Sequence, residues 1–184
     1  MKHSIKSIIG LILRLYVGYD FLTSGWEKII SGFNGTAVTG FLKGGLAQTH
    51  GALLASKGAA AAAHPNVSDV WAWFISNVFI PSSPLVACFV KFGEFFVGLG
   101  LILGCFSALA AFFGIIMNFS YLLSGTVSVN PQLIIFQLII LLIGAAIYTI
   151  GVDQFFMGKL VAKYPVLQKG FFKVLFPVDN NSEV

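Results

Sequence analysis

Apolar residues gather in four long segments of the chain, separated by two short turns and one long stretch rich in glycine and alanine. The four segments cover approximately residues 6–30, 84–105, 107–124 and 132–151. Because a membrane-spanning helix needs about 20 predominantly apolar residues, the pattern predicts four transmembrane helices. Pro84 and Pro131 stand at the expected starts of the second and fourth helices, where the first helical turn tolerates proline.

The composition also indicates an integral membrane protein. Hydrophobic residues make up 57% of the 184 residues, charged residues make up only 10%, and the mean hydropathy is +0.89. Soluble domains carry about 25% charged residues. The N-terminal apolar run is interrupted by Arg14 and Asp20 and lacks a cleavage site, so we interpret it as a retained span rather than a signal peptide. We therefore predict a single all-α membrane domain, residues 1–184, folded as a four-helix bundle.

The positions of the lysines predict how the chain is oriented in the cell membrane. Cytoplasmic segments of membrane proteins carry more lysine and arginine than external segments. Lys2 and Lys6 lie at the N-terminus, and the tail, residues 153–184, carries four more lysines. The long loop, residues 31–83, has only two lysines. The multi-pass chain is therefore predicted to keep both termini in the cytoplasm and to place the long loop outside. With a net charge of only +4 and no basic cluster among aromatics, we expect a lipid bilayer and no nucleic acid as its partner.

The long loop contains a tryptophan-rich segment, SDVWAWFISNVFIP, just before the second span. Ser68 is a suitable N-cap for a short helix at this position. Helical spacing would then place four apolar side chains on one face, namely Trp71, Phe74, Ile75 and Val78. Two interpretations stay open: a helix that lies in the external membrane interface, or a lid packed on the ends of the spans.

Charged residues within the first two apolar segments are the main indication of function. The first segment contains Arg14, Asp20, Glu27 and Lys28, and the second contains Lys91 and Glu94. Such residues are costly in a membrane and usually face the protein interior in pairs. On each helix the charges share one stripe with glycines: Arg14, Gly18, Phe21, Gly25 and Lys28 on the first, and Lys91, Glu94, Gly98, Leu101 and Cys105 on the second. Because small residues let helices approach closely, these two stripes are predicted to face each other.

Depth along the two helices predicts which of the charges meet. A rise of about 1.5 Å per residue places Arg14 within reach of Glu94, and it places Asp20 at the depth of Lys91. We therefore predict an Arg14–Glu94 pair and an Asp20–Lys91 pair, with Lys28 near the external interface, where a solvated position is favoured. Either these pairs only fix the packing of the helices, since buried ion pairs add little stability, or they form a functional site. The second interpretation is the default for charge inside a membrane.

Other polar and reactive residues point less clearly to a function. Asn118 in the third segment would either donate a hydrogen bond to a ligand or bond to a neighbouring helix. His50 and His64 lie in the loop without partners at metal-binding spacing, so we expect no metal site. Cys88 and Cys105 fit no redox or zinc-binding spacing, and we expect them to be small buried hydrophobic residues.

Four stretches of the sequence also share their order and spacing with a known family. They are RLYVGYDFLTSGWEKI (14–29), FGEFFVGLGLILG (92–104), MNFSYLLSGTVSVNP (117–131) and GVDQFF (151–156). Within them, Gly93 and Glu94 match a Gly-Glu pair, and Gly151 and Asp153 match a closing Gly-x-Asp. Together the four stretches resemble the DoxX/DoxD family of four-helix membrane proteins. The resemblance implies a membrane subunit of a quinone-linked oxidoreductase, of the thiosulfate:quinone oxidoreductase type.

This resemblance and the buried charges together suggest a charged pocket in the bundle, which binds a quinone or a small anionic substrate. The quinone would be the electron acceptor. Glu94 and Arg14 are the candidate catalytic residues: Glu94 would carry protons or orient a cation, and Arg14 would supply positive potential. The candidate substrate-binding residues are Lys28, Lys91, Asp20 and Asn118.

Electron transfer to a quinone requires an electron donor, and we find no redox cofactor motif for one in the sequence. Electrons would therefore pass directly or through a partner redox subunit, and association with a second copy of the chain is the other expected interaction. Whether the chain is itself an enzyme is left open. The alternative function is a non-enzymatic membrane scaffold or small-solute permease, in which the charged stripe holds the helices together or lines a path.

Overall fold

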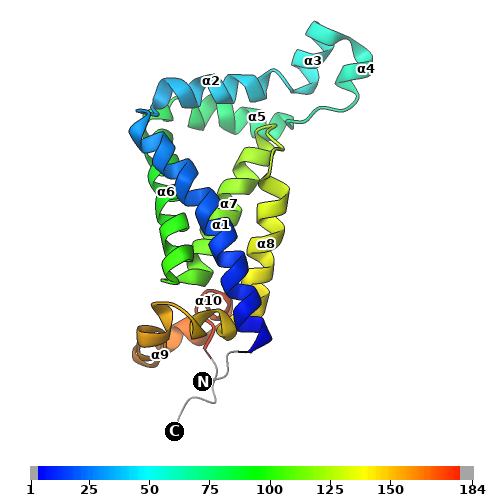
Figure 1. The fold of residues 1–184 in the computed structure, drawn as a ribbon. Helices are drawn as coiled ribbons and strands as arrows, with labels where there is room; N and C mark the ends of the chain where they lie inside the picture. Colours follow the sequence, from blue (N-terminus) through cyan, green and yellow to red (C-terminus); the bar gives the residue numbers. More distant parts are fainter. Residues whose placement is uncertain (1–3, 179–184) are drawn as a thin grey trace.

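The computed structural model describes residues 4–178, and this part of the chain is helical throughout its regular structure, without a β-strand (Figure 1). The all-α prediction is therefore confirmed. Lys2 and the end of the predicted tail, residues 179–184, lie outside the described residues. Two helical stretches, Ser83–Leu103 and Asn130–Thr149, are long and apolar enough to cross a membrane, and Ser107–Leu123 is a shorter apolar helix.

Each of the four predicted apolar segments is helical. The α-helices are α1 (Ile5–Ile30), α2 (Gly35–Leu46), α3 (His50–Lys57), α4 (Ala59–Ala62), α5 (Asp69–Phe74), α6 (Ser83–Leu103), α7 (Ser107–Leu123), α8 (Asn130–Ile143), α9 (Asp153–Lys163) and α10 (Phe172–Leu175). A π-helix, η1 (Ile75–Phe79), and two 3₁₀-helices, η2 (Gly144–Thr149) and η3 (Pro165–Gln168), complete the list. The predicted segments correspond to α1, α6, α7 and, for the fourth, α8 followed by η2.

Local sequence signals fix several helix ends. The side chain of Ser68 accepts a hydrogen bond from the backbone N–H of Trp71 over 3.3 Å, which makes Ser68 the N-cap of α5, as predicted. Pro84 and Pro131 lie in the first turns of α6 and α8. Gly104 ends α6 with φ of 66°, a left-handed conformation that glycine adopts without steric cost.

Four helices, α1, α6, α7 and α8, form the core of the molecule, and we call them the core helices. Helix α1 packs against α6 and α8, and α7 packs against the same two helices (Figure 1). Glycines allow the closest of these approaches: a Cβ atom on Gly98 would lie 2.6 Å from Cα of Leu22, and one on Gly25 would lie 2.8 Å from Cα of Phe95. The prediction that the glycine stripes of α1 and α6 face each other is confirmed.

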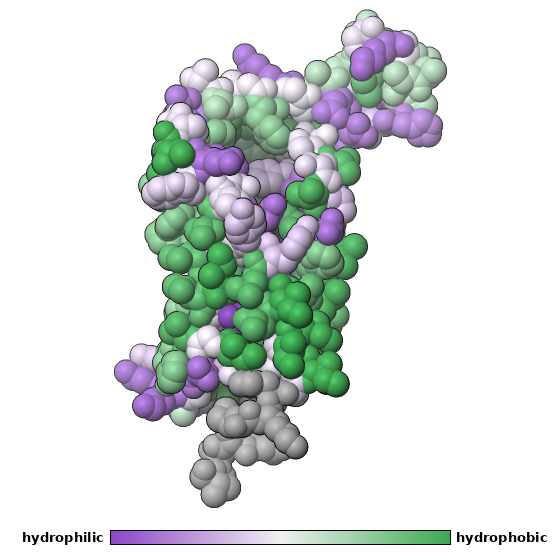
Figure 2. Space-filling view, viewed as in Figure 1, coloured by the Kyte–Doolittle hydropathy of each residue, from purple (hydrophilic) through white to green (hydrophobic). Residues whose placement is uncertain are grey.

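Polar residues are buried among the core helices, whereas the surface around them is apolar. Five large polar or charged side chains are at most 4% exposed: Arg14, Glu94, Asn118, Gln137 and Asp153. Figure 2 shows a broad hydrophobic belt across the visible face of the core helices. Apolar side chains on these helices are widely exposed, as in Leu142 of α8 at 84% and Phe96 of α6 at 62%. This distribution is the reverse of that in soluble proteins, whose charged residues lie outside, and it is typical of helices surrounded by lipid.

Helices α2 and α5 and the π-helix η1 lie across one end of the core helices, and we call this layer the lid (Figure 1). Two glycines of α2 make its close contacts: a Cβ on Gly35 would lie 2.9 Å from the nitrogen of Pro84, and one on Gly45 would lie 2.6 Å from the carbonyl oxygen of Ser124. Nε1 of Trp71 donates a hydrogen bond to Oγ of Ser124 over 3.0 Å. Of the two interpretations of the tryptophan-rich segment, the structure therefore favours the lid.

The burial of two regions differs from the sequence prediction. The expected apolar face of the tryptophan-rich segment is wrong in part, because Ile75 is buried while Phe74 and Val78 are about 40% exposed. The α-helix gives way to a π-helix at Ile75, and the longer turn of a π-helix changes the spacing of side chains on a face. Cys88, predicted to be buried, is exposed on α6, because the outer surface of these helices accepts small apolar groups.

The end of the core helices opposite the lid is covered by the C-terminal segments, and we call it the tail end. Helices α9 and α10 lie there, beside the start of α1 (Figure 1). The hydroxyl group of Tyr148 donates a hydrogen bond to the carbonyl oxygen of Leu175 over 2.9 Å, and Leu175 is buried. The tail is thus folded back onto the core helices.

Candidate functional site

A cavity of about 550 Å³ lies beneath the lid, between the ends of the core helices. Figure 2 shows the molecule hollowed at this place, below the lid and above the hydrophobic belt. Most of the wall is apolar and comes from several elements, as in Phe21 of α1, Leu42 of α2, Phe79 of η1 and Leu133 of α8. This size and character are those of a site for a small organic molecule, because such sites are mostly apolar hollows of roughly 300–1,000 Å³ with a few polar groups.

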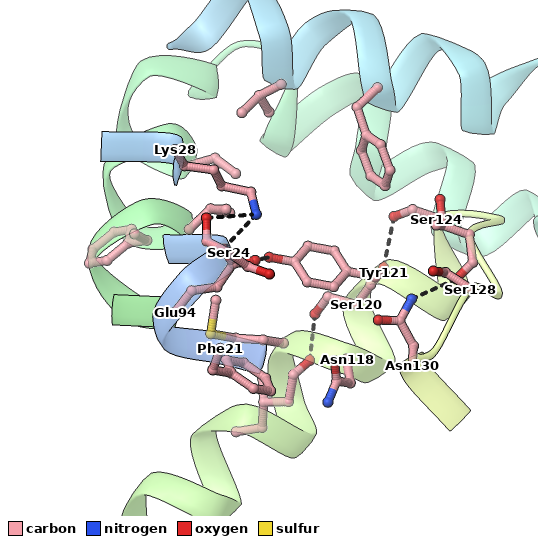
Figure 3. A pocket seen from close by; sticks show the side chains of 18 of the residues that line it. Phe21, Ser24, Lys28, Glu94, Asn118, Ser120, Tyr121, Ser124, Ser128 and Asn130 are labelled. Atoms are coloured by element: carbon pink, nitrogen blue, oxygen red, sulfur yellow. Dashed lines mark hydrogen bonds and ion pairs between the residues drawn. The ribbon is translucent and has the colours of Figure 1, made fainter. Parts of the chain in front are cut away.

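Three polar side chains meet at one wall of the cavity, and we call them the Glu94 centre: Lys28, Glu94 and Tyr121 (Figure 3). Nζ of Lys28 lies 2.6 Å from Oε2 of Glu94, and the hydroxyl group of Tyr121 donates to Oε1 of Glu94 over 2.6 Å. The side chain of Glu94 is 5% exposed and that of Lys28 is 28% exposed. Both carboxylate oxygens therefore have a donor, which offsets the cost of burying the charge.

The partner of Glu94 differs from the predicted one. The predicted Arg14–Glu94 pair is wrong, because Lys28 occupies that place. The cause is the crossing of α1 and α6: Gly25 packs directly against the backbone of Glu94 and Phe95, so the next turn of α1 brings Lys28 level with the carboxylate. Lys28 does lie in the last turn of α1 and is 28% exposed, as expected, but its ammonium group is paired with Glu94 rather than free in solvent.

The structure brings together four of the six predicted site residues. Asp20 and Asn118 line the cavity with Lys28 and Glu94, whereas Arg14 and Lys91 do not. The predicted Asp20–Lys91 pair is absent from the described residues, among which Lys28–Glu94 is the only salt bridge within 4.0 Å. Instead, Nζ of Lys91 lies 5.5 Å from the ring centre of Phe92.

Several cavity residues with hydrogen-bonding side chains were not among the predicted site residues, and Tyr121 and Trp71 are the largest of them. Tyr121 lies three residues after Asn118, and Ser124 follows three residues later, so all three share one face of α7. That spacing was a signal in the sequence. The position of Trp71 depends on how the lid folds over α7, and no local pattern predicts it. Residues 4–178 contain no group of three or more histidine, cysteine or acidic side chains placed to hold a metal ion.

Asn118 connects the floor of the cavity to a neighbouring helix. Its Nδ2 atom donates a hydrogen bond to Oε1 of Gln137 on α8 over 3.0 Å, and both residues are buried. The Nε2 atom of Gln137 has no hydrogen-bond partner among the described residues, and it points at Gly114, where a side chain would collide with it. The structure thus supports the interpretation in which Asn118 bonds to another helix, and it also leaves Asn118 at the cavity wall.

Arg14 lies toward the tail end, where three backbone carbonyl groups accept its hydrogen bonds. Nε donates to the oxygen of Leu101 over 3.0 Å, and Nη1 donates to the oxygens of Ile147 and Ile150 over 2.7 Å each. The oxygen of Leu101 is free because α6 ends two residues later, at Leu103. Those of Ile147 and Ile150 are free because α8 ends at Ile143 and η2 follows, with Gly144 at a φ of 67°. The fourth apolar segment is therefore not one continuous α-helix, because its last turns present carbonyl groups to Arg14.

Asp153 is fully buried beside Arg14 and caps the start of α7, and we call the two the Arg14–Asp153 centre. Oδ1 accepts from the backbone N–H of Phe106 over 2.6 Å, and Oδ2 accepts from the N–H and the hydroxyl group of Ser107 over 2.9 and 2.7 Å. A carboxylate at a helix N-terminus is favourable because the free N–H groups point at it. A Cβ on Gly104 would collide with the guanidinium of Arg14, so this centre has no room for a ligand.

The helices and these two buried centres define a helical membrane protein with a lidded internal cavity. The chain belongs to the DoxX family, because the model of that family matches residues 9–126. This match confirms the resemblance found in the sequence. It includes Lys28, Glu94 and Tyr121 and ends before α8 and Asp153. No curated protein and no solved structure matches the chain.

Proposed function

We propose that the four core helices cross the cell membrane as a bundle, with the lid outside and the tail end in the cytoplasm. Large apolar side chains are exposed on all four core helices, among them Ile12 of α1, Phe96 of α6, Phe113 of α7 and Leu142 of α8, which supports four crossings. Lys159, Lys163 and Lys173 belong to the tail end, whereas the segment between α1 and α6 contains only two lysines. The cavity and the Glu94 centre then lie in the external half of the membrane.

Thiol labelling in intact cells tests this orientation. The background is a variant without native thiols, Cys88→Ser with Cys105→Ser. In it, Ser56→Cys on the exposed surface of α3 should react with a membrane-impermeant maleimide, and Lys163→Cys on α9 should react only after the cells are opened. The reverse pattern would overturn the orientation, and labelling of both positions in intact cells would show that the chain does not separate them.

The function that the cavity supports best is that of a membrane subunit of a quinone-linked oxidoreductase, with the quinone ring held beneath the lid. One observation carries this proposal: a mostly apolar cavity of about 550 Å³ has Lys28 and Tyr121 at its wall, both oriented by Glu94. A quinone ring is flat and apolar with carbonyl oxygens at its edge, so it matches apolar walls that carry a few polar groups. When bound, the quinone would accept electrons, which a partner redox subunit would supply.

Each residue of the Glu94 centre would have a different role in binding the quinone ring. The ammonium group of Lys28 has three N–H donors, of which one goes to Glu94 and one makes a long 3.5 Å contact with the oxygen of Ser24. The third would be directed at a quinone oxygen. Glu94 would hold Lys28 in place and balance its charge, and Asp20 would be a second acidic group near the ring. A small anion would use the same ammonium group, so binding must be compared for both.

Titration of the purified protein in lipid nanodiscs with a short-chain quinone tests the proposal. Trp71 lines the cavity, so binding should quench its fluorescence in a saturable way, and the Trp71→Phe variant should lose that signal. Glu94→Asp withdraws the carboxylate by roughly 1.5 Å, about one bond length. It should weaken quinone binding at least tenfold, because a small misplacement of a positioning group has a large effect.

The matched control is Glu27→Asp, which changes an exposed glutamate of α1, next to Lys28 in the chain, and should leave binding unchanged. Normal quinone affinity in Glu94→Asp would reduce Glu94 to a packing role. If no quinone changes the fluorescence of Trp71 in the wild-type protein, but a small anion such as thiosulfate does, the cavity is an anion site. If neither ligand binds, the proposed function is wrong and a scaffold or permease becomes the better explanation.

A further inference from the structure

A second hollow lies between α6 and α7 on their outer surface, and we call it the α6–α7 groove. Its volume is about 530 Å³, and apolar side chains, glycines and Cys105 form its entire wall. It extends along α6 from Phe89 to Leu103, which is about 21 Å at 1.5 Å per residue. Phe96 and Phe113 at its sides are 62% and 50% exposed, so the groove opens toward the surrounding lipid.

The α6–α7 groove adjoins the cavity that contains the Glu94 centre. Three residues, Phe89, Ile116 and Met117, line both hollows. At this junction Gly93 has no side chain, and a Cβ atom there would lie 3.3 Å from Sδ and Cε of Met117. A methionine side chain is flexible, and Met117 is therefore the movable group between the two hollows.

We infer that the ligand of the cavity is a lipid with a long hydrocarbon tail, and that its tail passes Met117 and lies in the α6–α7 groove. The inference rests on the proposed function, because the headgroup that it places beside Glu94 is the quinone ring. The arrangement matches such a molecule in two parts: a cavity with polar groups for the head, and an entirely apolar groove of extended shape for the tail.

The groove would act as the route of entry for the ligand. A hydrocarbon tail gains little energy by leaving the bilayer for the groove, because both surroundings are apolar. What the groove provides is a continuous apolar path, so a membrane-dissolved ligand reaches the Glu94 centre without passing through water. A water-soluble anion is not stabilised by an apolar path through the membrane. Of the two candidate ligands, the groove therefore favours the lipid over the anion.

Two quinones with the same ring, one with an isoprenoid tail and one without a tail, test the inference in nanodiscs. The readout is the fluorescence of Trp71, with affinities expressed against the quinone concentration in the membrane. Ala110→Phe and Leu109→Phe fill the α6–α7 groove at residues that do not line the cavity. Each variant should weaken binding of the tailed quinone at least fivefold and change binding of the tail-less quinone less than twofold.

The control is Ile135→Phe, which enlarges an exposed residue of α8 that lines neither hollow and should affect neither quinone. The inference is overturned if the tailed quinone binds the groove variants as it binds the wild type, or if both quinones lose affinity in parallel. Should the groove variants change only the oligomeric state, the groove is covered by a second copy of the chain and the inference also fails. Binding of neither quinone to the wild-type protein would instead remove the proposed function.

Discussion

The Glu94 centre and the Arg14–Asp153 centre each bury an acidic side chain among the same core helices, but only the first borders open space. Glu94 is bonded to Lys28 and Tyr121 at the wall of a cavity of about 550 Å³. Asp153 and Arg14 have backbone groups as most of their partners, and Gly104 closes the space around them. In both centres the buried charges have hydrogen-bonding or charged partners. The presence of such partners therefore does not distinguish a binding site from a group that only stabilises the fold.

The kind of partner and the space around it distinguish the two centres. Backbone carbonyl and N–H groups are fixed by the helices, so the Arg14–Asp153 centre locks α1, α6, α7 and the segment after α8 in one arrangement. The partners of Glu94 are side chains with rotatable bonds, and they can turn toward a ligand. We therefore assign the first arrangement to the stability of the fold and the second to binding, and three predictions separate these roles.

The largest effect is expected from Asp153→Asn. Asparagine keeps the shape, but its NH₂ group faces donors of Phe106 or Ser107, and the charge beside Arg14 is lost. We expect the free energy of unfolding in detergent to fall by about 3–5 kcal/mol, as for other buried charges that lose their partner. The measurement is denaturant unfolding followed by circular dichroism. Asp69→Asn on the exposed first turn of α5 is the control, and equal stability of both variants would contradict the structural role.

A smaller loss of stability and a larger loss of binding are expected from Glu94→Gln. Lys28 loses its counter-charge but remains 28% exposed, so solvent screens it and the loss of stability should be about 1–2 kcal/mol. In the double variant Glu94→Gln with Lys28→Met, part of this stability should return, because no unpaired charge is left. Quinone affinity should not return. A double variant that recovers both properties would show that the centre only packs the helices.

The smallest effect is expected at the lid, from Trp71→Phe. The change removes the hydrogen bond from Nε1 to Ser124 and keeps most of the apolar contact, so a loss of about 1 kcal/mol or less is expected. Hydrogen exchange should be faster in α2 and α5 and unchanged in the core helices. Trp73→Phe alters a tryptophan of the same helix that is 58% exposed, and it should change neither. Equal exchange in the two variants would mean that Trp71 does not hold the lid.

The four helical segments and the contact between α1 and α6 could be predicted because their causes are local or periodic. Apolar runs of the right length gave the helices, and the spacing of Gly18, Gly25 and Gly98 gave the facing surfaces. The lid as a layer was one of two open interpretations. Its packing depends on Gly45 meeting Ser124, two residues far apart in the chain, and no local pattern predicts such a contact.

Most residues of the candidate site could be predicted from the sequence, but the pairing of its charges could not. Lys28, Glu94, Asp20 and Asn118 do line one cavity, but the depth estimate matched Glu94 with the wrong cation. That estimate treated α1 and α6 as straight antiparallel rods with midpoints near Gly18 and Glu94, whereas the real register is set where Gly25 touches α6. Asp153 was seen as part of a motif, but its role depends on the turn between α6 and α7 and was not predicted.

The bonds of Arg14 also impose an order on the folding of the protein during its synthesis. Arg14 emerges from the ribosome near the beginning of translation, whereas two of its acceptors, Ile147 and Ile150, emerge more than 130 residues later. Until then only one of its three backbone acceptors, the oxygen of Leu101, has been synthesised. The contacts that fix Arg14 at the tail end can therefore be completed only after the segment that follows α8 has been synthesised.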